Sequence, residues 1–265
     1  MDVATVLPSL DQPGWRGWLR DSLNFLLGLH QPYHIFQGAL EKRPTNVFLG
    51  VLEEMKMVMD HGPLDGKIPA SGGAVMIANH PFGGADAIAL SAFCIRKRPD
   101  TKILANAVTA ELPGAEKWMI PLQILGQDGA IRSNRAAMKE AFTHLRSGGV
   151  LVVFPSGAVS RWRNDLARVA DPEWSQHVAR LATKTGAPVV PVKFFDRNPD
   201  WYEVLGALHP IMHTAMIVRV FLGSRGRTIR FRGGERIEAD VLQKFANTVD
   251  ATDYLRNAVD AIGEP

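Results

Sequence analysis

Two short segments of the chain combine residue types that can move protons and bind anions. The first is Asn79-His80-Pro81-Phe82-Gly83-Gly84-Ala85-Asp86. A histidine has an unperturbed pKa of about 6.5, so His80 can act as a general base near neutral pH. The paired glycines let the chain fold sharply, so that Asp86 can reach back to the imidazole. A carboxylate there would fix the tautomer of His80 and stabilise the imidazolium that forms.

The second segment is Phe154-Pro155-Ser156-Gly157-Ala158-Val159-Ser160-Arg161. Gly157 allows close approach of the backbone, and the amides that follow it can hold an anion or an oxyanion. Arg161 can contact a carboxylate or a phosphate. Neither GxGxxG nor GxxxxGK[ST] occurs in the chain, which argues against a glycine-rich nucleotide-binding loop.

Both segments directly follow apolar runs with the character of buried strands, at 74–78 and 150–154. Ligands of open α/β sheets bind at the carboxyl ends of strands, which is where both segments would lie. Similar strand patterns occur at 102–105, 188–195 and 227–232. Helical patterns alternate with them at 84–96, 133–147, 173–185, 239–246 and 250–262. The alternation predicts an α/β fold with a layered, mostly parallel sheet flanked by helices.

The first 65 residues have a different pattern and are predicted to form an N-terminal segment of amphipathic helices, ahead of an α/β domain at 66–265. Residues 15–29 and 46–60 repeat apolar side chains at helical spacing, and Pro32 interrupts the pattern between them. Two interpretations stay open. The helices either pack on the core or form an interfacial hairpin that touches a membrane surface or lines an acyl route.

The composition excludes several other classes of protein. The chain has 265 residues, of which 46% are hydrophobic and 22% charged, so it can bury a core and a pocket without disulfides. Its net charge of +3 is too small to argue for nucleic acid as a partner. The single cysteine, Cys94, rules out an intramolecular disulfide and is expected to be buried and inert.

Targeting, membrane-spanning and metal-binding patterns are also missing from the sequence. The N-terminus lacks the pattern of a signal peptide, and no apolar run reaches the roughly 20 residues of a spanning helix. His209 and His213 have a spacing compatible with a metal, but HExxH and a third ligand are missing. We expect these histidines to be structural and predict no metal.

Taken in order, the motifs resemble those of the glycerolipid and lysophospholipid acyltransferase family. That family has an Asn-His…Asp box, an arginine-bearing block, a Phe-Pro-Glu-Gly block and a Val-Pro-Val block. The corresponding segments here are 79–86, 122–135, 154–161 and 187–192, within a resemblance that covers about residues 68–238.

Two departures from the usual family pattern refine the resemblance. Five residues separate His80 from Asp86 instead of four, which resembles the hemolysin-like and ornithine-lipid-type O-acyltransferases. A local bulge at the two glycines would restore the contact between the histidine and the aspartate. Ser156 stands where the usual family member has glutamate, which favours a lyso-aminolipid over a glycerol phosphate as the acceptor.

The resemblance implies transfer of a fatty acyl group from an acyl-carrier protein or CoA thioester to the hydroxyl of a lysolipid. It implies that His80 is the general base and that Asp86 orients it. It also implies a peripheral enzyme at the cytoplasmic face of an inner membrane, with no cofactor, metal or nucleic acid. The residues implied to bind substrate are Asn79, Gly83, Gly84, Arg132, Arg135, Pro155, Ser156, Gly157, Ser160 and Arg161.

Some assignments stay open at this level. Arg132 and Arg135 both fit the arginine-bearing block, with Arg135 favoured for the headgroup. The arginines of 219–236 form either a solvated strand face or a docking site for an acyl-carrier protein, a CoA phosphate or anionic headgroups.

Alternative functions are also open. They are a 1-acylglycerol-3-phosphate acyltransferase that makes phosphatidate, a serine lipid or thioester hydrolase that uses Ser156, and a non-catalytic lipid-binding module. The hydrolase lacks the G-x-S-x-G elbow, because Phe154 stands at the first glycine position.

Overall fold

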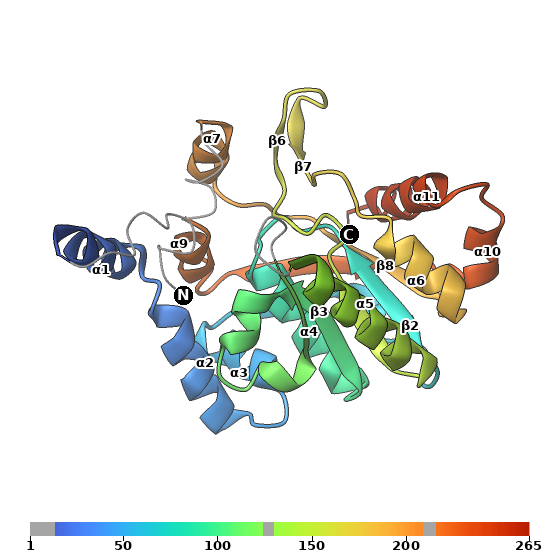
Figure 1. The fold of residues 1–265 in the computed structure, drawn as a ribbon, viewed down its shortest axis with the longest axis horizontal. Helices are drawn as coiled ribbons and strands as arrows, with labels where there is room; N and C mark the ends of the chain where they lie inside the picture. Colours follow the sequence, from blue (N-terminus) through green and yellow to red (C-terminus); the bar gives the residue numbers. More distant parts are fainter. Residues whose placement is uncertain (1–13, 124–129, 209–215, 265) are drawn as a thin grey trace.

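The computed structural model describes residues 14–123, 130–208 and 216–264 (Figure 1). A seven-stranded sheet has the order β1-β9-β8-β2-β5-β3-β4, and every neighbouring pair is parallel except β8 and β9. The predicted α/β class with a mostly parallel sheet is confirmed. The strands are β1 (Val58–Asp60), β2 (Ala74–Ala78), β3 (Thr101–Asn106), β4 (Met119–Leu122), β5 (Val150–Val153), β8 (Val189–Phe194) and β9 (Thr228–Gly233), with β6 (Arg161–Arg163) and β7 (Arg168–Ala170) in a separate antiparallel hairpin.

Helices cover both faces of the sheet (Figure 1). The described α-helices are α1 (Trp15–Leu27), α2 (Gln31–Lys42), α3 (Val47–Glu54), α4 (Ala85–Lys97), α5 (Ala130–Arg146), α6 (His177–Thr185), α7 (Asp200–Leu208), α9 (Ile217–Leu222), α10 (Ala239–Gln243) and α11 (Thr248–Asp260). Short 3-10 turns occupy Gly62–Leu64, Ala107–Glu111 and Glu116–Trp118. Among the residues described here, no helix is both long and apolar enough to cross a bilayer.

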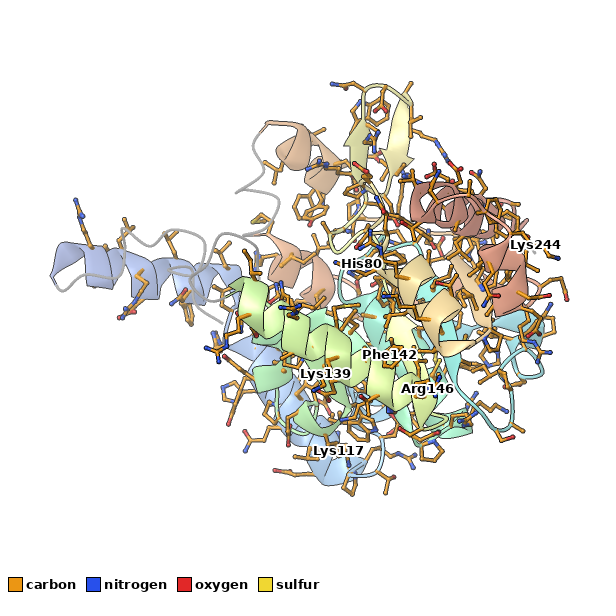
Figure 2. All side chains as sticks on the ribbon, turned by 45° about the vertical axis from the view of Figure 1, so that its right-hand side comes forward. His80, Lys117, Lys139, Phe142, Arg146 and Lys244 are labelled. Carbon is orange, nitrogen blue, oxygen red and sulfur yellow. The ribbon has the colours of Figure 1, made fainter. Side chains whose placement is uncertain are left out.

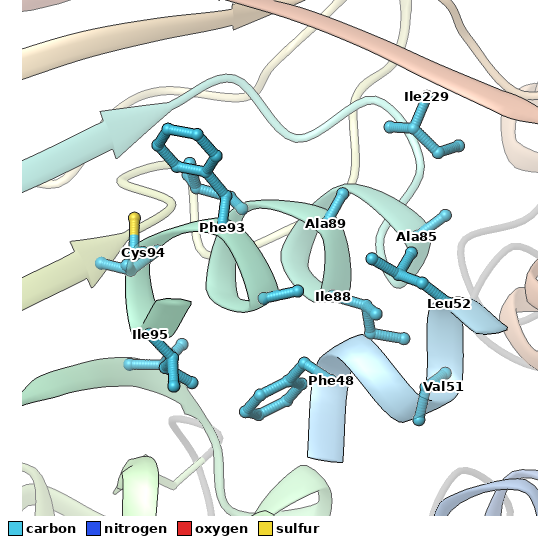
Figure 3. Close-up of a cluster of buried hydrophobic side chains, with 14 of the residues drawn as sticks. Phe48, Val51, Leu52, Ala85, Ile88, Ala89, Phe93, Cys94, Ile95 and Ile229 are labelled. Carbon is cyan, nitrogen blue, oxygen red and sulfur yellow. The ribbon is translucent and has the colours of Figure 1, made fainter. Parts of the chain in front are cut away.

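The central strand β2 sends its side chains alternately into two hydrophobic cores, because successive residues of a strand point to opposite faces. Met76 joins the core beneath α2, α3 and α4. Val75 and Ile77 join the core beneath α5, α6 and α11. Figure 3 shows Ile88 of α4 directed toward α3, where Phe48 and Leu52 lie, and Phe93 on the opposite side of α4. A strand buried on both faces reads as a continuous apolar run, which is why 74–78 was predictable.

The N-terminal region is only partly as predicted. The helix expected over 46–60 ends at Glu54, and Val58–Asp60 instead forms β1 of the main sheet. Helix α1 ends before Pro32, in agreement with the predicted interruption, but the sequence did not predict the helix α2 that follows. Pro32 lies in the first turn of α2, where a missing amide costs nothing. The division at residue 65 stays a prediction.

The helices of this region combine features of both interpretations. Phe36 of α2 and Phe48 of α3 are buried in the main core. Leu19 and Leu23 of α1 pack against a small cluster formed by Leu29 and by Val218 of α9. Trp18 of α1 is 74% exposed, so part of the apolar pattern of 15–29 faces away from the core.

Three further helix boundaries differ from the prediction. The helix expected at 173–185 begins only at His177, because the residues before it are hydrogen-bonded around Asp171. The helix expected at 133–147 begins earlier, at Ala130, and the one expected at 239–246 ends earlier, at Gln243. His209 and His213 lie outside the described residues. Cys94 is buried, as expected, and burial raises the pKa of its thiol.

The contact between α2 and α3 gives a test of the packing. A Cβ added at Gly50 would lie 2.6 Å from the Ala39 carbonyl oxygen, and backbone cannot easily move away. We expect Gly50→Ala to lower the free energy of unfolding by about 1–3 kcal/mol, measured by denaturant titration. Gly38→Ala on the same helix pair is the control, because nothing lies within 4 Å of its added Cβ. It should be neutral or stabilising by up to about 1 kcal/mol. Equal effects of the two changes would contradict the close helix contact.

Candidate active site

The histidine box begins where β2 ends, and it forms the predicted pair. His80 Nδ1 lies 3.1 Å from Asp86 Oδ2. The Asp86 side chain is fully buried, and the His80 side chain is 14% exposed. Figure 2 shows His80 near the middle of the molecule, on the side of the projecting hairpin and α7. The pairing orients the imidazole and leaves Nε2 without a partner among the described groups.

Three backbone amides hold the Asp86 carboxylate in addition to His80. They belong to Phe82 at 2.9 Å, Gly83 at 3.4 Å and Ala87 at 2.8 Å. Gly83 has φ of +75°, and a Cβ there would lie 2.5 Å from the Val159 side chain. Only glycine fits both the backbone conformation and the space. The predicted bulge at the two glycines is therefore present, and it restores the His80–Asp86 contact across five intervening residues.

A second buried carboxylate, Asp171, also supports the box and was missed in the sequence. Its Oδ1 accepts a hydrogen bond from the His80 amide at 3.1 Å and another from the Ser160 hydroxyl. Its Oδ2 accepts from Trp174 Nε1 at 2.9 Å. Burial raises the pKa of Asp171 above its ordinary value, although these hydrogen bonds oppose the shift. Asp171 follows β7, 91 positions after His80, so no local pattern pointed to it.

The surroundings of His80 favour its charged form overall. Burial lowers the pKa of His80, but attraction to Asp86, its hydrogen bond and attraction to Asp171 outweigh burial and raise the pKa above its ordinary value. The Phe154 ring covers the imidazole, with ring centroids 4.3 Å apart. Such a base is stronger than free histidine and stays shielded from bulk water, which suits removal of a proton from a hydroxyl.

Several predicted substrate-binding residues have their polar atoms engaged within the protein. The Asn79 amide exchanges two hydrogen bonds with the Phe194 backbone, at 3.0 and 2.7 Å. The Ser160 hydroxyl is bound to Asp171, and its amide donates to the His80 carbonyl at 2.9 Å. The buried Pro155 carbonyl accepts from the Ser175 amide. These groups position the box, while Gly84 caps α4 against Phe221.

The loop after β5 contains the candidate oxyanion donors. The Gly157 amide already donates to the Phe154 carbonyl at 3.0 Å. The next two amides, of Ala158 and Val159, donate to no described group. The Ser156 hydroxyl donates to the Ala158 carbonyl at 2.8 Å, and among described residues it has no imidazole partner. A Ser–His pair for a hydrolase is therefore not assembled.

The three candidate headgroup arginines lie on two different elements. Arg132 and Arg135 are exposed in the first turns of α5, which follows β4. Strand β4 is the third strand from β2 in the sheet, and no hydrogen bond is shown between these arginines and the histidine box among the described residues. Arg161 is exposed directly after Ser160, which is bonded to the His80 backbone. Of the three candidates, Arg161 is the one whose neighbour in the chain is hydrogen-bonded directly to His80.

A cavity of about 400 Å³ borders Phe82, two residues after His80. It is lined by Phe82, Phe195, Asp196, Arg197, Arg227 and Thr228. The sequence pattern did not single out Arg197, whereas Arg227 belongs to the arginines of 219–236 that it did single out. The two lie at one cavity because the pairing of β8 with β9 brings the residues after β8 beside those before β9. Elsewhere in the described chain, no group of three histidine, cysteine or acidic residues is arranged to hold a metal.

Comparisons with known proteins bear on the family of the chain. Residues 64–194 match the model of the acyltransferase family. The chain is 26% identical over 200 residues to the lyso-glycine lipid O-acyltransferase of Bacteroides thetaiotaomicron, covering 72% of this chain and 71% of the relative. The corresponding protein of Phocaeicola vulgatus is 24% identical over 200 residues, covering 72% of this chain and 69% of the relative. The solved PlsC acyltransferase of Thermotoga maritima is 15% identical, with a TM-score of 0.49 over 92% of this chain and 97% of its own.

The chain is an acyltransferase. The family match includes the histidine box, the loop after β5 and the Val-Pro-Val strand β8. These findings support the glycerolipid acyltransferase family, which the ordered motifs had predicted.

Removal of the imidazole tests its role as the base. We expect His80→Ala to lower kcat/KM by about 10²–10⁴-fold, the usual contribution of a positioned general base. Asp86 keeps three amide donors in this variant, so the fold should persist, as checked by circular dichroism. Activity within a few-fold of wild type would rule out His80 as the base.

The pH profile separates the electrostatic role of Asp86 from a purely structural one. Attraction to the Asp86 carboxylate helps to raise the pKa of His80. Asp86→Asn removes that charge, so the pKa of His80 falls, and the acid limb of kcat/KM against pH should move to lower pH. The maximal rate should fall at the same time, because the tautomer is no longer fixed. An acid limb that stays in place would contradict the pairing.

Asp171→Asn tests the second carboxylate as a positioning residue. The variant keeps the shape of the side chain but weakens hydrogen bonds to a buried charged group. We expect the free energy of unfolding to fall by about 1–3 kcal/mol and kcat to drop with little change in KM. The acid limb should shift in the same direction as in Asp86→Asn but less, because Asp171 contributes less to the pKa of His80. A change in KM alone would assign Asp171 to substrate binding instead.

Proposed function

We propose that the protein is a lysolipid O-acyltransferase that moves a fatty acyl group from a thioester to a lipid hydroxyl. The observation that carries the proposal is the buried His80–Asp86 pair with Nε2 of the imidazole unpartnered among the described groups. The relatives, which are O-acyltransferases of lyso-glycine lipids, support the same reaction.

In the proposed reaction, His80 Nε2 takes the proton of the acceptor hydroxyl while Nδ1–H donates to Asp86. The hydroxyl oxygen attacks the carbonyl carbon of the thioester and forms a tetrahedral intermediate. The amides of Ala158 and Val159 are the proposed donors to its oxyanion. The carbon–sulfur bond then breaks, and the imidazolium of His80 returns the proton to the leaving thiolate. The acyl group passes directly to the acceptor, so no serine nucleophile is required.

We propose a lyso-aminolipid as the acceptor, in preference to a lysophosphatidate. The names of the two relatives, both for a lyso-glycine lipid, support an amino-acid headgroup. Ser156 in place of the usual glutamate supports the same choice. Arg161 is our first candidate for the anionic part of the headgroup, ahead of Arg135 and Arg132, because its neighbour Ser160 is hydrogen-bonded to the His80 backbone.

The remaining features follow the family resemblance. The acyl donor is proposed to be an acyl-carrier protein or CoA thioester. The enzyme is proposed to act as a peripheral protein at the cytoplasmic face of an inner membrane. We propose no cofactor and no metal, because general-base catalysis by His80 accounts for the reaction.

An acyl-transfer assay tests the proposal. Purified enzyme is given acyl-carrier-protein and CoA thioesters, each with lyso-aminolipid and lysophosphatidate acceptors, and products are identified by mass spectrometry. We expect a diacylated aminolipid that is lost in His80→Ala. Phosphatidate as the main product would keep the mechanism and overturn the acceptor preference. Free fatty acid alone would overturn the transferase and favour a hydrolase.

A further inference from the structure

The β6–β7 hairpin and α7 expose large apolar side chains on the side of the molecule where His80 lies. Both elements project from the sheet on the same side (Figure 1). Trp162 and Leu166 of the hairpin are 44% and 42% exposed. Trp201 and Val204 of α7 are 47% and 58% exposed, and their spacing of three places them on one face of the helix. We call these four side chains the hairpin–α7 surface.

The two elements are packed together and form one unit. Helix α7 lies against β6. Its inner face carries Tyr202, which is fully buried, and Glu203, which is 5% exposed. Burial raises the pKa of Glu203 to about 7, against the opposing effects of Arg197 and the Trp162 amide. With Tyr202 and Glu203 turned inward, α7 leaves the large apolar side chains of Trp201 and Val204 on the outside. An ordinary solvated helix directs such side chains at the core.

This unit is tied directly to the histidine box at two points. The Ser160 amide, one residue before β6, donates to the His80 carbonyl at 2.9 Å. The Asn198 side chain, two residues before α7, donates to the Pro81 carbonyl at 2.9 Å and is 1% exposed. When the hairpin and α7 bind a partner, these hydrogen bonds therefore fix the position of His80 relative to that partner.

The charges of the hairpin complement an anionic surface. Residues 161–170 contain three arginines and one acid, Asp165. Asp165 pairs with Arg163, and Arg168 pairs at 3.6 Å with Asp260. Arg161 has no ion pair among the described residues and precedes Trp162 in β6. Tryptophan, leucine and arginine together are typical of residues that enter the headgroup zone of a bilayer.

We propose that the hairpin–α7 surface docks onto a lipid bilayer that contains anionic headgroups and holds His80 at its surface. The inference rests on the proposed function, in which the acceptor is itself a membrane lipid. The exposed side chains lie on projecting elements, which suits insertion into a lipid surface. A docked enzyme meets its acceptor by diffusion within the membrane, and the acceptor hydroxyl needs to rise only to the level of the histidine box.

Vesicle binding without any acyl donor tests docking separately from catalysis. The full chain is mixed with phosphatidylcholine vesicles, with or without phosphatidylglycerol, and bound protein is measured by flotation. We expect binding to the anionic vesicles, and the double variant Trp162→Ala/Leu166→Asp should lower the partition coefficient at least about tenfold, equal to about 1.4 kcal/mol. Val249→Asp on α11 is the matched control, because Val249 is 47% exposed on another element, and it should bind like wild type.

Activity measurements complete the test. The double variant should lose acyl transfer to acceptors in anionic vesicles and keep it for short-chain acceptors presented as monomers. Wild-type binding by the double variant, or failure of wild type to bind any vesicle, would overturn the proposal. So would loss of binding in Trp18→Ala/Phe25→Ala on α1 with the hairpin variant unaffected. Equal loss of activity with monomeric acceptor would assign the hairpin to catalysis, and a loss confined to acyl-carrier-protein donors would assign it to docking an acidic protein; both would overturn membrane docking.

Discussion

The burial of Asp86 is the constraint on which the rest of the site depends. A carboxylate removed from water is stable only when its oxygens are paired and hydrogen-bonded. The chain satisfies it with three amides and one imidazole, and those four donors come from residues 80–87. To bring them to one carboxylate, the chain must turn through a positive φ at Gly83 against Val159 and Ile217. The orientation of His80 is thus a consequence of the hydrogen bonds that the buried Asp86 carboxylate requires.

The parallel sheet explains why distant residues converge on that box. Strands β2, β5 and β8 are neighbours and run in the same direction, so the segments that follow them emerge at one edge. The end of β5 contributes Phe154, which covers the imidazole. The end of β8 contributes Phe194, which holds Asn79 by two backbone hydrogen bonds. Each neighbouring strand therefore restrains a different part of the His80 segment.

The sequence could predict the features that depend on local pattern. The strand 74–78 was identified because it is buried on both faces, and the His80–Asp86 contact because two glycines permit the turn between them. The sequence could not predict that Asp171 and Asn198 support the histidine box. Their partners lie 91 and 117 positions away, and no periodicity encodes such a pairing. The helix expected through residue 60 failed for a related reason: pairing with β9 outweighed the helical pattern of Val58–Asp60.

The same long-range contacts link chemistry to surface. Asp171 joins the His80 amide to Ser160, and Ser160 leads directly into the hairpin. Asn198 joins Pro81 to the start of α7. Exposing the apolar side chains of the hairpin and α7 to water has an unfavourable free energy, and these side chains do not contribute to either hydrophobic core. The proposed acceptor has a long acyl chain and dissolves in a bilayer. Moving the exposed apolar side chains of the enzyme from water into that bilayer would favour binding of the enzyme to the membrane that holds its acceptor. The hairpin and α7, which are hydrogen-bonded to the histidine box, would then both position His80 and attract the enzyme to the lipid.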